Sequence, residues 1–151
     1  MNINIAIAVV GWSAAALVPA PVVAPVVAQQ AARPMSSVWA GVYTEAQSTR
    51  GKALYADTCA SCHQADLSGG DIAPPLAGAM FNANWTGLTL ADLFERVRVS
   101  MPQDNPGKLS RQQVADVLAL MLDVGRFPAG GTELPSEREA LTQIKFEATK
   151  P

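Results

Sequence analysis

Two cysteines and one histidine form the most informative cluster in the sequence. Cys59 and Cys62 are the only cysteines of the 151-residue chain, and the only histidine, His63, directly follows the second. Two thiols at this spacing can add across the two vinyl groups of one haem, and the imidazole of the next residue then reaches the iron. The spacing therefore predicts covalent attachment of one haem c, with His63 as an iron ligand.

Three other interpretations of the cysteine pair are weaker. A disulfide between Cys59 and Cys62 would suit an exported protein, but it would close only a very small loop and leave the adjoining histidine unexplained. A structural zinc site needs four ligands, normally from two separated pairs, and the sequence has no second Cys or His pair. A thioredoxin-like redox pair belongs to a strand–helix–strand context, which the sequence pattern does not show.

The second axial ligand of the iron is expected to be a methionine, because the chain has no second histidine. A thioether favours ferrous iron and raises the potential of a His-ligated haem. Met1 and Met35 precede the expected folded domain. Met121 lies on an apolar helix stripe and Met80 follows His63 closely, so both are expected to be packing residues. Met101 stands between a helix end and a proline-rich loop, and we select Met101 as the distal ligand.

Helix-start motifs and apolar periodicity predict the elements that position these residues. The four-residue segments beginning at Thr44 and Ser110 have the form of capping boxes, and Thr89 starts a helix with an apolar stripe. We expect helices over residues 44–57, 89–101, 110–125 and 136–146, and irregular loops over 64–84 and 101–109. No segment alternates polar and apolar residues as a strand would. The expected fold class is all-α, with four to five short helices and long loops wrapped around one haem.

The first 28 residues are expected to direct export. Residues 3–18 form an apolar run as long as a signal-peptide core and shorter than the roughly 20 residues that a spanning helix needs. Prolines follow this run, and small or branched residues precede a cleavage site after Ala28. We predict a signal peptide at 1–28, a flexible leader at 29–42, a haem-binding domain at 43–146, and a periplasmic protein without a stable membrane span. An uncleaved membrane anchor is the alternative.

The charge of the chain excludes one class of partner. The 13 acidic and 11 basic residues give a formal net charge of −2 without a basic cluster, so nucleic acid is not an expected partner. Four cations flank the Met101 region: Arg96, Arg98, Lys108 and Arg111. They could steer an acidic partner, meet the haem propionates or simply lie in solvent.

From about residue 51 to residue 134 the sequence closely resembles the class I mono-haem c-type cytochromes. The resemblance rests on residues 51–55, the five-residue motif at 59–63, and residues 74–78, 100–102 and 117–120. It implies the class I cytochrome c fold for the 43–146 domain. A wider pattern, which includes Phe81, Trp85 and residues 127–130, looks like the small cytochromes that accompany or are fused to bacterial quinoprotein dehydrogenases. Ala73 departs from the glycine that many class I members carry before the conserved proline.

The resemblance implies a role for several residues around the haem. His63 would be the proximal ligand and Met101 the distal one, and the Pro74 carbonyl would accept a hydrogen bond from the other ring nitrogen of His63. Leu76 would pack on the haem, and the Trp85 indole would donate to a haem propionate or serve as an ordinary core aromatic. The resemblance also implies a close crossing of the first and last family helices, formed by Gly51 and an aliphatic residue of the late helix.

The favoured function is that of an electron-transfer protein and not an enzyme. Such a protein cycles its haem between Fe(III) and Fe(II), accepts electrons from a dehydrogenase and passes them to an oxidase or another cytochrome. A haem subunit of a dehydrogenase complex is one alternative. A haem enzyme or gas sensor with an open distal position is another, although such a site normally needs a polar distal group, often histidine.

Overall fold

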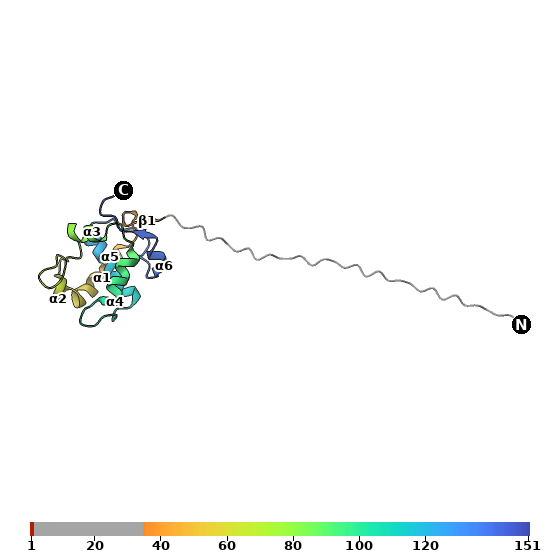
Figure 1. Cartoon of the computed structure of the whole chain (residues 1–151), viewed down its shortest axis with the longest axis horizontal. Coiled ribbons are helices and arrows are strands. Elements are labelled where there is room, and N and C mark those ends of the chain that lie inside the picture. Colours follow the sequence, from red (N-terminus) through yellow and green to blue (C-terminus); the bar gives the residue numbers. More distant parts are fainter. Residues whose placement is uncertain (2–34) are drawn as a thin grey trace. The chain divides into compact units, whose positions relative to one another are not determined.

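The computed structural model describes residue 1 and residues 35–151, which form six α-helices and one pair of very short strands (Figure 1). In chain order the elements are β1 (Ser36–Ser37), the 3-10 helix η1 (Val38–Ala40), α1 (Glu45–Thr58), α2 (Ala60–His63), α3 (Ala79–Trp85), α4 (Leu90–Ser100), α5 (Arg111–Val124), α6 (Arg138–Leu141) and β2 (Ile144–Lys145). The predicted all-α class is confirmed, with six helices in place of the four to five expected. None of the helices in the described part of the chain is long and apolar enough to cross a membrane.

Side-chain caps start α4 and α5 where the sequence predicts. Thr89 and Asp92 exchange side-chain and backbone hydrogen bonds at the start of α4, and Ser110 and Gln113 do the same at the start of α5. Each complete capping box satisfies two backbone amides that would otherwise lack a partner in the first helical turn. These contacts fix the residue at which α4 begins. They therefore help to determine which of its side chains face the interior.

The predicted capping box at the start of α1 is only half formed. Thr44 accepts a hydrogen bond from the Gln47 amide at 3.1 Å. The side chain of Gln47 is instead fully buried and bonds both backbone groups of Leu134, at 3.0 Å to the carbonyl oxygen and 2.7 Å to the amide. A buried amide needs partners for both its donor and its acceptor, and the distant Leu134 backbone supplies them.

The helices α1 and α5 cross at the centre of the domain (Figure 1). A Cβ atom on Gly51 would overlap the carbonyl oxygen of Asp116 and lie 2.6 Å from its carbonyl carbon, so only glycine permits this approach. The close crossing implied by the resemblance is confirmed, although Gly51 meets the backbone of α5 and not an aliphatic side chain. Because α5 is central, it is buried on all sides between residues 114 and 122 and not on one stripe alone.

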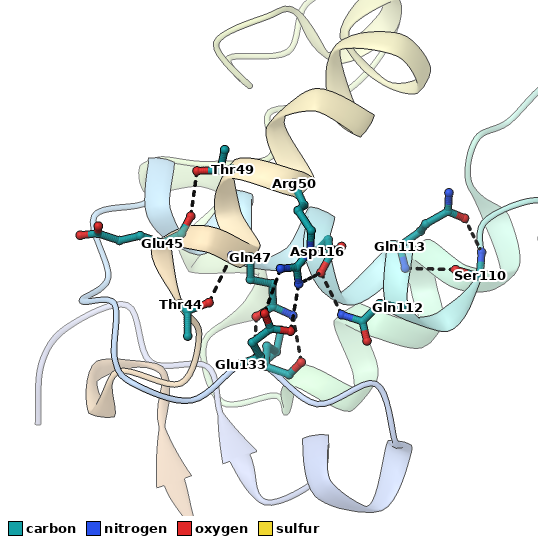
Figure 2. A network of polar contacts seen from close by, with 11 residues as sticks. Thr44, Glu45, Gln47, Thr49, Arg50, Ser110, Gln112, Gln113, Asp116 and Glu133 are labelled. Carbon is teal, nitrogen blue, oxygen red and sulfur yellow. Dashed lines mark hydrogen bonds and ion pairs between the residues drawn. The ribbon is translucent and has the colours of Figure 1, made fainter.

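Next to this crossing, Arg50 joins α1 to α5 and to the segment after α5 (Figure 2). Its guanidinium donates to both carboxylate oxygens of Asp116, at 3.0 and 3.1 Å, and to both of Glu133, at 2.9 Å each. Gln112 donates to Asp116 as well, at 2.9 Å. The hydrogen bonds to Asp116 and then to Glu133 hold the pKa of Arg50 above its usual value. The network fixes the rotation of α1 about the crossing point.

Two predicted segments differ from the structure. The expected loop at 64–84 ends in a helix, α3, whose Phe81 is buried and packs edge-on against Phe146 with ring centroids 5.7 Å apart. The expected last helix at 136–146 stops at Leu141, has no side-chain cap, and gives way to β2. Contacts between residues far apart in sequence hold both segments, so glycine and proline content and helix periodicity did not reveal them.

The described part of the predicted flexible leader, residues 35–42, has regular structure. β1 pairs in parallel with β2, placing Ser36 opposite Ile144. Val38 is fully buried, and the Trp39 indole packs against Phe127 at 4.8 Å while its nitrogen donates to the Glu147 carbonyl at 2.9 Å. The predicted flexible leader does not describe these residues, because they bury Val38 and pack Trp39 against Phe127 and Glu147. The predicted signal peptide at 1–28 and residues 29–34 lie outside the described residues, apart from Met1.

Candidate functional site

The cysteine motif forms a helical turn directly after α1. The Cys59 amide donates to Tyr55 at 2.9 Å, and the Cys59 carbonyl accepts from Cys62 at 3.2 Å and from His63 at 3.0 Å. Residues three and four positions apart share one face of such a turn, so Cys59, Cys62 and His63 are brought to the same side. Both cysteines are free thiols, and burial raises the pKa of Cys59. This local geometry suits attachment of one flat ligand at two points.

The imidazole of His63 is held by a backbone carbonyl. The ring is buried, with 7% exposed, and its Nδ1 lies 2.8 Å from the carbonyl oxygen of Pro74. Because a carbonyl can only accept, Nδ1 carries the hydrogen and Nε2 keeps its lone pair. A neutral imidazole fixed in this tautomer is the form that binds a metal. The hydrogen bond that the resemblance implied is therefore confirmed.

A tight loop between α2 and α3 carries the Pro74 carbonyl. Backbone hydrogen bonds close it at three levels: the amide of Gly69 donates to His63 at 3.0 Å, that of Gly70 to Ala73 at 2.8 Å, and that of Leu76 to Leu67 at 2.9 Å.

Gly69 packs against the far end of this loop. It has a left-handed φ of +68°, and a Cβ atom there would overlap the nitrogen of Pro75 and lie 2.5 Å from the carbonyl carbon of Pro74. Ala73, where the sequence departs from many class I members, needs no positive φ. The loop therefore places Pro74 through backbone contacts.

The cysteine turn, the Pro74 loop, the helices α1, α3, α4 and α5, and the loop after α4 line one open cavity of about 870 Å³. This volume falls within the roughly 300–1,000 Å³ typical of ligand pockets. Its walls carry the motif residues and many apolar side chains, in particular Cys59, Cys62, His63, Pro74, Pro75, Leu76, Phe81, Trp85, Leu93, Val97, Met101, Val117 and Met121. The four residues predicted to bind the cofactor thus border the same cavity, together with Pro74, Leu76 and Trp85.

The methionines differ in their relation to the cavity. Met101 caps the C-terminal end of α4 and lines the cavity. Met121 also lines it and is itself buried on α5, which agrees with its expected packing role. Met80 is 64% exposed and does not line the cavity, so the expectation that Met80 packs is wrong. The reason is that Phe81, and not Met80, is the residue of α3 that faces the interior.

Several cavity residues were not identified from the sequence. Val117 lines the cavity from α5, Asn84 from the end of α3, and Ile72 from the loop before Pro74. Spacing offers a signal for Val117 alone, since it lies four residues before Met121 on the same helix face. Nothing local in the sequence marks Asn84 or Ile72.

The residues at this site fit a covalently attached haem. Two free thiols can form thioether bonds, the Nε2 of His63 and the thioether of Met101 are groups that can bind iron, and the surrounding walls are largely apolar. The buried imidazole with its proton already assigned is the strongest of these observations, because its outer nitrogen needs no rearrangement to bind a metal. The assignment of Cys59, Cys62, His63 and Met101 as the cofactor-binding residues stays a prediction.

Comparison with known proteins gives one family match. The family described as "Cytochrome C oxidase, cbb3-type, subunit III" matches residues 46–121, half of the chain. None of the curated proteins shows significant similarity. Among solved structures, the sulfane dehydrogenase SoxCD from Paracoccus pantotrophus is similar with 26% identity and a TM-score of 0.47, over 65% of this chain and 52% of that chain. The chain thus spans about half the length of that solved chain.

Proposed function

Because the chain belongs to the c-type cytochrome family described as cytochrome C oxidase, cbb3-type, subunit III, we propose that it is a periplasmic electron carrier with a single covalent haem. Family membership makes it a class I c-type cytochrome with haem-based electron transfer. The number of haems, the ligands, the cellular location and the direction of electron flow are the proposed parts. The observation that supports one haem and these ligands is the convergence of Cys59, Cys62, His63 and Met101 on one cavity; the proposed location rests on the export signal expected at residues 1–28.

Each of the four residues has a distinct task in this proposal. Cys59 and Cys62 hold the haem by thioether bonds, while His63 and Met101 bind its iron. When bound, the haem supplies a reversible one-electron change at iron. The Pro74 carbonyl keeps the proton of His63 on Nδ1 and increases the basicity of the ring, which tunes the iron.

The apolar walls of the cavity support electron transfer in preference to catalysis. Leu76, Phe81, Leu93 and Val97 line the cavity and would shield a bound haem from water, which would favour the less charged ferrous state. His63 and Met101 together would supply both protein ligands of the iron, which would leave no open site for a substrate or a gas. The proposed chemistry is therefore electron transfer without bond making at the iron.

The partners follow from the chemistry of such a carrier. We propose a dehydrogenase as donor and an oxidase or another cytochrome as acceptor, which contact the chain through small, brief interfaces. The resemblance to cytochromes of quinoprotein dehydrogenases makes a quinoprotein the preferred donor to test. A permanent place in a dehydrogenase complex is the alternative, and copurification from the native host separates a bound subunit from a free carrier.

The ligand assignment is tested by absorption spectroscopy of methionine variants. The oxidised protein should show the methionine-to-iron charge-transfer band, and Met101→Ala should abolish this band while the haem stays attached. Met80→Ala is the matched control, because Met80 is exposed and away from the cavity, and it should leave the band intact. Loss of the band in Met80→Ala, or its persistence in Met101→Ala, would refute the assignment. His63→Ala should prevent stable haem-bound protein, and a normal low-spin spectrum in this variant would refute the whole proposal.

A further inference from the structure

The four cations near Met101 fall into two groups in the structure. Arg98 and Arg111 both interact with Glu95. Arg98 donates two hydrogen bonds to it, at 2.8 and 3.0 Å, and Arg111 lies 4.0 Å from its other oxygen. The Arg111 guanidinium also stacks over the Phe94 ring at 5.0 Å. The hydrogen bonds from Arg98 lower the pKa of Glu95. These two arginines are therefore satisfied by the protein itself.

Arg96 is different because it faces the cavity. On α4 it lies three residues after Leu93 and one before Val97, a spacing that puts all three side chains on one helix face. All three line the cavity. Leu93 is buried, Val97 is half-buried and Arg96 is exposed, so Arg96 is the member of this row that reaches solvent. Within residues 35–151 the Arg96 guanidinium forms no ion pair, although Asp57 and Asp104 also border the cavity.

The chemistry of a haem supplies the missing partner for such a group. A haem carries two carboxylates at one edge, and an arginine fork matches a carboxylate with two parallel hydrogen bonds. Lys108 also lines the cavity, but it lies in an exposed loop and presents a point charge on a flexible stem. Arg96 stands on the regular backbone of α4, and its planar guanidinium loses less freedom per hydrogen bond formed than the flexible lysine does.

We propose that Arg96 binds a carboxylate of the haem and raises the reduction potential of the iron. This inference rests on the proposed function, because it requires a haem in the cavity. A positive charge beside the haem disfavours the ferric state, which carries one more positive charge than the ferrous state. Arg96 is thus a positioning and tuning residue for the cofactor, whereas Arg98 and Arg111 are structural.

The test compares matched variants of the haem-bound protein by potentiometric titration at low ionic strength. Arg96→Gln should lower the ferrous-to-ferric equilibrium ratio two- to tenfold, and the upper limit corresponds to about 59 mV for one electron. Arg98→Gln, two residues away on the same helix, should change the ratio less than twofold. Lys108→Gln should change the reduction potential less than Arg96→Gln does. Added salt should remove the change in Lys108→Gln. Arg96→Gln should also move the carboxylate bending vibration of the haem in resonance Raman spectra, which a purely structural role would not do.

A conservative variant keeps the test decisive if Arg96→Gln loads haem poorly. Arg96→Lys keeps the charge and should stay within twofold of the wild-type equilibrium ratio, and a larger change would overturn the inference. Equal shifts in Arg96→Gln and Arg98→Gln, a larger shift in Lys108→Gln, or an unmoved carboxylate vibration would overturn the inference. Failure of the proposed function would look different, since the wild-type protein itself would then carry no covalent haem or lack the charge-transfer band.

Discussion

Gly69 gives the sharpest test of how the backbone orients the proposed iron ligand. Its Cα packs against the Pro74–Pro75 peptide, and a Cβ atom would overlap the Pro75 nitrogen and lie 2.5 Å from the Pro74 carbonyl carbon and 2.7 Å from the Ala73 oxygen. All three neighbours are backbone atoms and cannot rotate away. The change Gly69→Ala must therefore push the loop aside, together with the carbonyl that holds His63.

The size of the effect follows from these contacts. Ordinary contact of a Cβ begins near 3.4 Å, so the loop must retreat by about 1 Å. The hydrogen bond between His63 and Pro74 measures 2.8 Å, and a contact of roughly 3.6 Å is no longer a hydrogen bond. The left-handed backbone adds about 1–2 kcal/mol for alanine and the clash about 1–3 kcal/mol. Alanine also restricts the unfolded chain more than glycine does, and this effect offsets about 0.4–1 kcal/mol of the loss. We expect a net loss of about 3 kcal/mol in the free energy of unfolding, within a range of about 1–4.6 kcal/mol.

Two other glycines, Gly70 and Gly87, separate the contributions to this loss. Gly70→Ala introduces no clash, because its Cβ meets only Gln64 Nε2 at 3.5 Å. Gly87→Ala has a positive φ of +91° but open space around its Cβ. Denaturant unfolding of the haem-bound proteins should give almost no loss for Gly70→Ala and about 1 kcal/mol for Gly87→Ala. Of the three variants, only Gly69→Ala should lose more than about 1 kcal/mol in the free energy of unfolding.

The reduction potential gives the second measurement on the same three variants. Without the Pro74 acceptor the His63 ring is a weaker base and stabilises ferric iron less, so the potential of Gly69→Ala should rise. Gly70→Ala and Gly87→Ala should keep the wild-type potential. A Gly69→Ala protein as stable as Gly87→Ala with an unchanged potential would refute the view that Gly69 positions His63 through the loop.

The other predictions concern the crossing of α1 and α5. Gly51→Ala should destabilise the protein in denaturant unfolding, because overpacking against the backbone of Asp116 costs about 1–3 kcal/mol or more and exceeds the helix-propensity gain of about 1 kcal/mol; a more stable variant would contradict this. Asp116→Asn should destabilise more than Glu133→Gln, since the Asp116 side chain is 10% exposed and that of Glu133 is 47% exposed. Added salt should remove the effect of Glu133→Gln and leave most of that of Asp116→Asn, and equal salt sensitivity would contradict the assignment.

The sequence predicted those parts of the fold that depend on local chemistry. Thr89 and Ser110 start helices through contacts within four residues, so the motif is visible in the sequence and the helix begins where expected. α3 has no side-chain cap and is held by Phe81 against Phe146, and η1 is held by Val38 and Trp39 against the end of the chain. Such contacts join segments more than 60 residues apart, and no short window of sequence contains both partners.

The residues of the candidate site also divide into those that local sequence predicts and those that it does not. The cysteine motif is local, so the spacing of Cys59, Cys62 and His63 was enough to assign them a chemistry, and Met101 followed because alternative ligands were few. The helix face occupied by Arg96 was also readable, since Leu93 and Val97 belong to the predicted apolar stripe of α4.

The sequence did not show which of the four cations pair with acidic residues of the protein itself. The pairing of Arg98 and Arg111 with Glu95 answers that question and leaves Arg96 as the helix-borne cation at the cavity. A charge that the fold does not satisfy, at the mouth of an apolar cavity, is the feature through which this chain can adjust its cofactor without changing a ligand.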